Sequence, residues 1–203
     1  MATVLIVSKT QMKNGVCVGG INENTNELIR IHNERGGNLP PDAPYEIGDR
    51  WSMSVETAWN VRPAPHTEDK QTTPIRKIEN VGVQGIDDYV RQNASSLRLT
   101  RGSLSRAFQG MLHLEGTRNY VNRSNVPSFS TEFWIADKDL IHSVQFGKDY
   151  FFYDRIRIKY VGFQPCIRRI PAGTIIRLSL ANWWDDESSG EERCYLQLSG
   201  WYL

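Results

Sequence analysis

The sequence predicts an all-β protein with a few short helices. The clearest sign lies in residues 150–203, where apolar and polar side chains alternate along several short stretches. A period of two places the two sets on opposite faces of a strand, which is typical of a sheet buried on one face. In the first stretch the apolar set is Ile156, Ile158 and Tyr160, and the basic set is Arg155, Arg157 and Lys159.

Two more alternating stretches follow, Ile175–Leu180 and Cys194–Ser199. The acidic residues 185–192 lie between them and contain Gly and Ser, a composition that favours a hairpin loop. Antiparallel strands joined in this way predict a sheet that is closed or packed so that its edges are protected.

Short apolar runs also predict strands near the start of the chain. Thr3–Val7 is rich in β-branched residues and indicates a buried strand. After an expected polar turn at Lys9–Gly15, the run Val16–Ile21 predicts a second strand, in which Gly19 and Gly20 favour a bulge or a bend. Two further expected strands are Leu28–His32 and Arg50–Trp59.

The middle of the chain is expected to hold loops and helices. The Pro-containing segment Asn60–Pro74 predicts a long loop, followed by a weak strand at Ile75–Val83. Gly85–Asn93 predicts a helix with two acidic residues in its first turn, where they would favour the macrodipole. Ser103 is the expected cap of a second helix, Leu104–Leu112. A loop at Gly116–Ser128 and a strand at Ser130–Ala136 complete this part.

The composition excludes a disordered chain but leaves the partner class open. The 203 residues are 39% hydrophobic and carry a formal net charge of +1, so the whole molecule has no electrostatic bias toward a polyanion. Residues 91–123, however, contain a single acid, Glu115, and these basic residues: Arg91, Arg98, Arg101, Arg106, Arg118 and Arg123. Such a local excess either attracts nucleic acid or only solvates the surface of a β-protein.

The three cysteines, Cys17, Cys166 and Cys194, are widely spaced and have no CxxC pattern. This spacing predicts neither a disulfide framework nor a zinc site, and no cofactor is expected. The N-terminus has no leader-like pattern, and no apolar run approaches the length of about 20 residues that spans a bilayer. The expectation is a reduced, cytoplasmic protein without membrane attachment.

Several stretches resemble the dual OB-containing domain family over essentially the full length: IVSKT, VCVGGI, YEIGDRW, APHTED and RLSLANWW with the ending ERCYLQLSGWYL. The resemblance implies two tandem OB-like Greek-key barrels of five strands, whose central strand face often binds oligonucleotides. It also implies a link to bacterial conflict and defence systems. We expect barrels at residues 1–80 and 129–203, joined by a helical and loop segment at 81–128.

One candidate site combines cations with aromatic rings. Arg155, Arg157 and Lys159 follow Tyr150 and Phe152, and cations that track phosphates beside rings that stack bases are typical of single-strand binding. Arg98, Arg101 and Arg106 from the basic stretch are added to this predicted set. The alternative is that the aromatic residues belong to the core and the basic row is a solvated outer face.

A second candidate is the pair Trp183-Trp184 at the end of a strand. Neighbouring strand residues point in opposite directions, so at most one indole is expected in the core. Trp184 is the candidate for partner binding, and the alternative is that it packs under the adjacent loop. Asp185 and Asp186 follow it and would repel phosphate. This favours a protein partner at that position.

A third candidate, metal-dependent hydrolysis, rests on His66, Glu68 and Asp69, but no second ligand cluster completes it. The alternative is a structural loop in which Glu68 or Asp69 accepts backbone N–H bonds. GxSxG, GxGxxG and GxxxxGK[ST] are absent, so the sequence predicts no enzyme. The leading hypothesis is a non-enzymatic accessory protein of a prokaryotic defence system that binds the backbone of single-stranded DNA or RNA. The rival is a protein-interaction scaffold that docks a partner enzyme through an aromatic surface.

Overall fold

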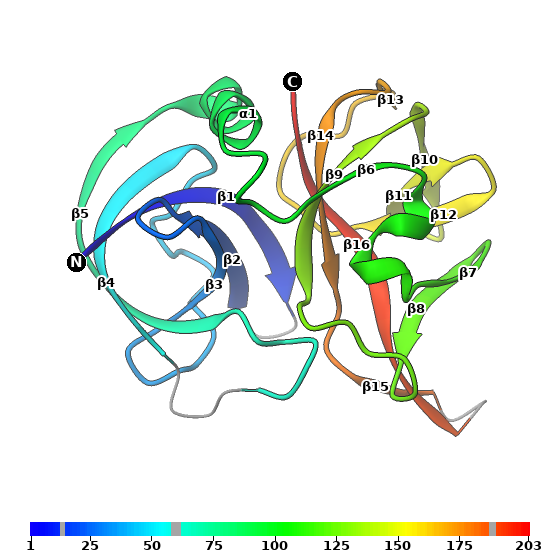
Figure 1. Ribbon diagram of the computed structural model, residues 1–203, viewed down its shortest axis with the longest axis horizontal. Helices are drawn as coiled ribbons and strands as arrows, with labels where there is room; N and C mark the ends of the chain where they lie inside the picture. Colours follow the sequence, from blue (N-terminus) through cyan, green and yellow to red (C-terminus); the bar gives the residue numbers. More distant parts are fainter. Residues whose placement is uncertain (13–14, 58–61, 187–189) are drawn as a thin grey trace. The chain divides into compact units, whose positions relative to one another are not determined.

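The computed structural model describes residues 1–12, 15–57, 62–186 and 190–203 (Figure 1). Trp59, the first residues of the predicted loop Asn60–Pro74 and the middle of the predicted loop 185–192 lie outside this part. Contacts divide the chain into two compact units. Unit 1 contains residues 1–62, 68–98 and 202–203, and unit 2 contains residues 63–67 and 99–201. Residues 81–128, expected as one connecting segment, are divided between the units.

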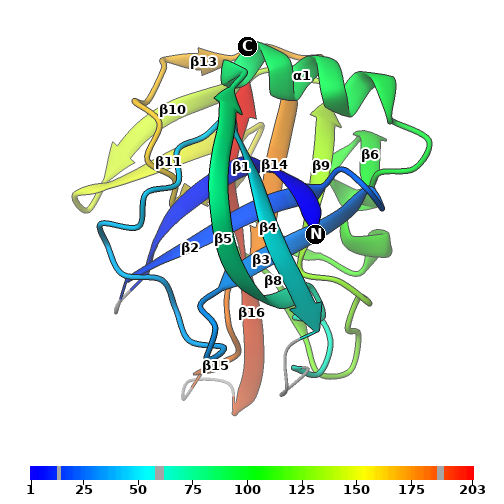
Figure 2. The same ribbon diagram turned by 90° about the vertical axis from the view of Figure 1, so that its left-hand side faces the viewer.

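Unit 1 is a closed five-stranded barrel. Its strands are β1 (Ala2–Met12), β2 (Gly15–Asn22), β3 (Glu27–His32), β4 (Asp49–Thr57) and β5 (Asp69–Asn80). The order is β1-β2-β3-β5-β4, and β4 pairs with β1 to close the ring (Figure 2). β3 and β5 are parallel and the other pairs are antiparallel. A Greek-key barrel of this kind is the architecture of an OB-fold.

Glycines let the first hairpin bend around this barrel. The β1–β2 register shifts between Ile6 and Ser8, which lie opposite Gly20 and Gly19. The irregularity predicted at these glycines is therefore confirmed, but the extra residue is on β1 and not on β2. A Cβ atom on Gly20 would lie 2.6 Å from Val4 Cγ1, which excludes a side chain there. The predicted turn at Lys9–Gly15 is wrong over residues 9–12, because pairing with β2 continues to Met12.

The predicted loop Asn60–Pro74 is wrong from Asp69 onward, where β5 begins. The register shifts between Ser52 and Met53, and Met53 pairs with Pro74 at this irregularity. A strand tolerates proline beside a bulge, because the missing N–H then interrupts no ladder. β5 ends at Asn80, so the predicted strand Ile75–Val83 is its second half.

The predicted helix at 85–93 is confirmed as α1 (Gly82–Gln92). It begins earlier than expected, so Asp87 and Asp88 lie beyond the first turn and do not serve the macrodipole there. Asp87 Oδ2 instead accepts a hydrogen bond from Arg91 Nε at 2.7 Å, an ion pair one turn apart. No helix in the described part of the chain is long and apolar enough to cross a membrane.

Unit 2 is built on an eleven-stranded sheet. Its strands are β6 (Leu99–Gly102), β7 (His113–Glu115), β8 (Arg118–Asn122), β9 (Thr131–Ala136), β10 (Leu140–Gln145), β11 (Lys148–Tyr153), β12 (Ile156–Tyr160), β13 (Arg169–Ile170), β14 (Ile175–Leu180), β15 (Trp184–Asp186) and β16 (Glu191–Tyr202). The main path runs β13-β10-β11-β12-β16-β14-β9-β6. The predicted strand Ser130–Ala136 and the strands of the last third are confirmed.

The sheet order of unit 2 repeats the order of unit 1. β9 and β10 are separated only by residues 137–139, so the path β10-β11-β12-β16-β14-β9 returns to the same stretch of chain. β12 and β16 are parallel, as β3 and β5 are in unit 1. In unit 2, β9 and β10 together therefore correspond to β1 of unit 1, and β11 and β12 correspond to β2 and β3. This order agrees with a second OB-like unit, and the all-β fold class is confirmed.

Two predictions for residues 103–128 are wrong. Two short 3₁₀ helices, η1 (Leu104–Arg106) and η2 (Phe108–Gly110), replace the expected helix, because Phe108 and Gln109 take positive φ angles of 50° and 61°. The Ser103 hydroxyl does accept a hydrogen bond from Ser105 N, at 3.4 Å. The expected loop Gly116–Ser128 contains β8, which pairs with β7 and β16.

The core of unit 2 confirms the alternation seen in the sequence. Its fully or nearly buried members from the C-terminal strands are Ile158, Tyr160, Ile176, Leu178, Leu180, Cys194, Leu196 and Leu198. Phe151 and Tyr153 of β11 belong to the same core. Arg155 is a correction, because it lies in the turn between β11 and β12 and not on the strand face.

A candidate nucleic-acid interface on the second unit

The antiparallel pair β11–β12 presents an outer face of aromatic and basic side chains. In the register of this pair, Tyr150 lies opposite Lys159 and Phe152 lies opposite Arg157. The intervening pair, Phe151 and Ile158, points into the core. Because side chains alternate along a strand, all four outer residues share one face. The structure thus brings together four of the eight residues predicted for nucleic-acid binding.

Lys148 extends this face by one position and was missed in the sequence. It lies on β11 two residues before Tyr150, so it has the same orientation as Tyr150 and Phe152. Lys148 and Lys159 are both exposed, and neither forms an ion pair within the described part of the chain. Partial burial first, and then the positive charge of Lys148, lowers the pKa of Lys159. The fold therefore holds the two ammonium groups close enough for their charges to repel.

Arg157 is held more firmly than the lysines. Its guanidinium carbon lies 4.6 Å from the centre of the Tyr150 ring, and its Nη1 donates a hydrogen bond to Gln145 Oε1 at 2.8 Å. A guanidinium over an aromatic face is a stabilising cation–π contact. Arg157 therefore supports the arrangement of the face as well as its charge.

Arg155 stands in the exposed turn that joins the two strands. Its neighbour Asp154 forms an ion pair with Lys138, with 2.5 Å between Lys138 Nζ and Asp154 Oδ2. This leaves Arg155 without an ion-pair partner among the described residues. We define the basic aromatic face as the strand residues Lys148, Tyr150, Phe152, Arg157 and Lys159 together with Arg155 of the adjoining turn.

The remaining predicted cations are not brought to this face by the strand register. Arg98 belongs to unit 1, where its Nη1 lies 2.7 Å from Oε1 of the buried Glu68 carboxylate. Arg101 is exposed on β6, which pairs with β9 at the far end of the sheet order from β12. Arg106 is exposed in η1.

The equivalent face of unit 1 offers no free cations within the described residues of β2 and β3. Arg30 and His32 of β3 are buried around Asp69, with 2.5 Å from Arg30 Nε and 3.2 Å from His32 Nε2 to Asp69 Oδ1. Burial would raise the pKa of Asp69, but the close contact with His32 and the hydrogen bond from Arg30 outweigh it and hold that pKa well below its usual range. The charged groups of Arg30 and Asp69 therefore pair with each other inside unit 1.

Comparison with known families agrees with two OB-like units. The sequence profile of the dual OB-containing domain family matches residues 2–201. This chain belongs to the dual OB-containing domain family. Searches of curated proteins and of solved structures give no match. OB domains are a common scaffold for oligonucleotide binding, and the second and third strands provide the usual face.

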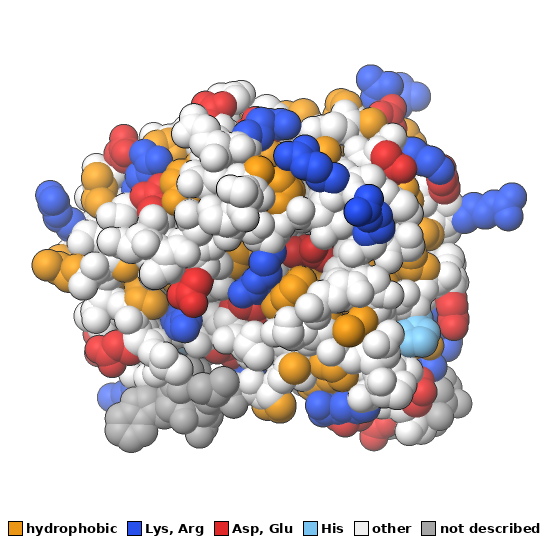
Figure 3. Space-filling model, viewed as in Figure 1, with side chains coloured by type: hydrophobic (Ala, Val, Ile, Leu, Met, Phe, Trp, Pro, Cys, Tyr) orange, Lys and Arg blue, Asp and Glu red, His pale blue; other side chains and the backbone are white. Residues whose placement is uncertain are grey.

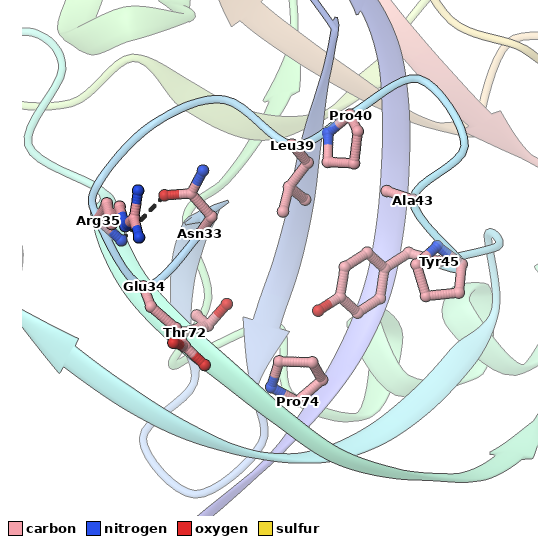
Figure 4. Close-up of a pocket in the computed structure, with 10 residues that line it drawn as sticks. Asn33, Glu34, Arg35, Leu39, Pro40, Ala43, Tyr45, Thr72 and Pro74 are labelled. Carbon is pink, nitrogen blue, oxygen red and sulfur yellow. Dashed lines mark hydrogen bonds between the residues drawn. The ribbon is translucent and has the colours of Figure 1, made fainter.

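The dual OB chain also has a pocket that no predicted site residue lines. The cavity, of about 450 Å³, lies in unit 1 (Figure 4) and is lined by Asn33, Glu34, Arg35, Leu39, Pro40, Ala43, Pro44, Tyr45, Thr72 and Pro74. Asn33 Oδ1 accepts a hydrogen bond from Arg35 N at 2.9 Å and orders the loop at the rim. The pocket floor is apolar, and Glu34 and Arg35 give its rim opposite charges.

The tryptophan pair divides as expected. Trp183 packs against the core of unit 2, with the Arg123 guanidinium 3.8 Å from its ring centre. Trp184 lies on β15 opposite Arg193 and is 66% exposed. The indole of Trp184 is therefore accessible on the surface of this OB unit.

His66, Glu68 and Asp69 of the dual OB chain are all buried. Arg98 pairs with the Glu68 carboxylate and Arg30 pairs with that of Asp69, while His66 Nε2 lies 3.7 Å from Cys194 Sγ. Guanidinium groups thus already occupy the two carboxylates that a metal ion would need. Hydrolysis through these residues stays a hypothesis that this geometry does not favour.

Charges of both signs are interspersed over the surface. Figure 3 shows Lys and Arg side chains mixed with Asp and Glu over the face that it displays. Together with the formal net charge of +1, this mixing means that attraction to a polyanion must come from a local set of cations. The basic aromatic face is such a set.

Proposed function

We propose that this dual OB protein binds single-stranded DNA or RNA along its phosphate backbone, through the basic aromatic face, and that it does so without catalysing a reaction. The observation that carries the proposal is the β11–β12 register. It places Tyr150 beside Lys159 and Phe152 beside Arg157, on the outer side of the second and third strands of unit 2. This is the position that OB-folds use for oligonucleotides.

The chemistry of the face suits a single strand. Each base that stacks on an aromatic side chain contributes about 1–3 kcal/mol, and stacking tolerates any sequence because every base has a π-face. Cations beside the rings release counterions when they meet phosphates. Partial burial, and after it repulsion from Lys148, lowers the pKa of Lys159 in the free protein, and a bound phosphate would relieve this repulsion.

The other surfaces suit this ligand less well. The β2–β3 face of unit 1 keeps Arg30 and His32 buried around Asp69. The unit 1 pocket has one cation and one carboxylate at its rim, so it provides no net attraction for phosphate. Asp185, beside the exposed Trp184, would repel a nucleic-acid backbone.

We further propose that the protein is an accessory component of a bacterial defence system. The family resemblance supports this role, and the absence of the common catalytic motifs from the sequence favours binding over catalysis. In such a system the protein would hold a single strand for a partner enzyme.

Fluorescence anisotropy with a labelled single-stranded oligonucleotide tests the proposal. We expect saturable binding that weakens as salt rises, with a slope of log K against log salt of about −0.7 for each phosphate contact. Binding should be similar for DNA sequences of different composition. Absence of binding at low salt would refute the proposal.

The exposed Trp184 favours a second candidate function, a scaffold that docks a protein partner through an aromatic surface. Aromatic side chains are enriched at such interfaces. The two functions are distinguished by Trp184→Ala, which should leave oligonucleotide affinity unchanged if nucleic acid binds at the basic aromatic face.

A further inference from the structure

Three side chains with metal-binding atoms meet on unit 2, away from the basic aromatic face. They are His142 of β10, Asp149 of β11 and Cys166 of the segment between β12 and β13. One ligand atom from each lies within 4.8 Å of the other two. Among the described residues, no other group of three His, Cys, Asp or Glu side chains converges in this way.

Strand register places the first two ligands on one face. His142 lies opposite Phe151, and Val144 lies opposite Asp149, so His142 and Asp149 are diagonal neighbours across the hairpin. His142 Nε2 and Asp149 Oδ1 are 2.7 Å apart. Tyr150 and Phe152 point to the other side of β11, so a ligand at this group is independent of nucleic acid on the basic aromatic face.

Hydrogen bonds on both sides of Cys166 fix the third ligand. His142 N donates to Arg168 O at 3.0 Å, which lays the segment beside β10. Gln164 precedes Cys166 by two residues, and its side-chain Nε2 donates a hydrogen bond to Trp201 O at 2.9 Å. The backbone carbonyl of Gln164 accepts a hydrogen bond from the Tyr160 hydroxyl at 2.9 Å. The backbone that carries the thiol is therefore positioned without any metal.

The group does not have the order of a nucleophilic triad. His142 Nε2 is occupied by Asp149. A nucleophilic cysteine needs an adjacent base and a lowered pKa. The convergence of one nitrogen, one oxygen and one sulfur atom within 4.8 Å of one another instead suits coordination of a cation.

We propose that His142 Nε2, an Asp149 carboxylate oxygen and Cys166 Sγ bind a zinc-class divalent cation. Nitrogen, sulfur and oxygen ligands in one set are typical of zinc, and three protein ligands leave the fourth tetrahedral position to water. Zinc–ligand bonds of about 2.0–2.3 Å place tetrahedral ligand atoms roughly 3.3–3.7 Å apart. The His142–Asp149 contact of 2.7 Å must therefore widen by about 0.6 Å or more to admit the ion.

Coordination also moves two protons. The Cys166 thiol releases its proton to solvent and binds as thiolate. The proton that His142 Nε2 donates to Asp149 moves through solvent to Nδ1, which frees Nε2 to bind the ion. Asp149 is half exposed and Cys166 is exposed, so the ion can enter directly from solvent. The proposed site departs from the sequence expectation, which included no metal.

Cobalt(II) titration of the full chain, stripped with a chelator, tests the site. We expect one equivalent of cobalt to produce a near-ultraviolet thiolate-to-cobalt band together with intense visible bands of tetrahedral cobalt, and zinc to abolish both. Zinc alone should raise the melting temperature, because a ligand that binds only the folded state stabilises it.

Variants show whether the three ligands act together. Cys166→Ser should remove the thiolate band, and Asp149→Asn and His142→Gln should each weaken cobalt affinity at least tenfold, a typical minimum effect for a lost ligand interaction. Cys17→Ser is the matched control and should leave the titration unchanged, because Cys17 lies on β2 in unit 1. Circular dichroism checks that each variant is folded. A missing band in the wild type, a band that survives Cys166→Ser, or an affinity unaffected by Asp149→Asn and His142→Gln would each overturn the proposal.

Discussion

Replacing both unpaired lysines of the basic aromatic face should weaken nucleic-acid binding without unfolding the protein. The variant is Lys148→Gln with Lys159→Gln. Neither side chain has an ion-pair partner in the described structure, so no carboxylate is left uncompensated. Exposed substitutions of this kind change stability by about 0.5 kcal/mol or less.

The magnitude follows from the number of cations. If Lys148, Arg155, Arg157 and Lys159 each meet one phosphate, the wild-type slope of log K against log salt is about −2.8, at roughly −0.7 per contact on a single strand. Removing two contacts should reduce the slope to about −1.4. At 0.1 M salt, the counterion term for two contacts corresponds to a loss of affinity of about 25-fold.

Fluorescence anisotropy over a salt series measures both quantities, and thermal unfolding reports stability. Arg35→Gln with Arg76→Gln is the control, because it removes the same charge from exposed residues of unit 1. An equal loss of affinity in the control would assign the effect to net charge. An unchanged slope in the lysine variant would refute the role of the face.

Three further predictions concern single side chains. Phe152→Ala should cost about 1–3 kcal/mol of binding free energy, measured by anisotropy, with the salt slope unchanged because stacking releases no counterions. Arg157→Ala should lower the free energy of unfolding by about 1–2 kcal/mol in a urea titration, because it removes the contact with Tyr150 and the bond to Gln145. Asp49 is buried, and burial by itself raises the pKa of its carboxyl group. Hydrogen bonds, among them those from Lys77 and Asn80, together have the larger effect, so the pKa lies below its usual value. A lowered carboxyl pKa gives stability that is present above the unfolded pKa of about 3.9 and is lost as the pH falls below it. Asp49→Asn should therefore reduce the melting temperature at pH 7. Below about pH 4 the melting temperature of the variant should differ less from that of the wild type.

Alternation allowed much of the β-architecture to be predicted from sequence. The alternation in the sequence identifies the strands β12, β14 and β16, and in β12 it also identifies the buried face. In β14 and at the end of β16 residues on both faces are buried, including Ile175 and Arg177. Local signals failed where tertiary structure outweighs them. Pro74 suggested a loop, but a bulge accommodates it in β5. Residues 104–112 have helical spacing, but the positive φ angles of Phe108 and Gln109 interrupt the helix.

The candidate sites show the same limit. The outer face of β11 and β12 follows from alternation, and continuing the period back from Tyr150 would have included Lys148. Arg98 looked like a surface cation, but its partner Glu68 is distant in sequence and could not be foreseen. The group of His142, Asp149 and Cys166 depends on the register of one hairpin and on a segment laid beside it. Spacing along the chain carries no signal for such a convergence.

The most direct test of nucleic-acid binding at unit 2 is an amide NMR titration of the isotope-labelled protein with a short single-stranded oligothymidine. The proposal predicts that the largest shifts fall within Lys148–Tyr153 and Ile156–Tyr160, with β2 and β3 of unit 1 unaffected. Shifts centred on β2 and β3 or on the pocket around Tyr45, with β11 and β12 unchanged, would contradict it.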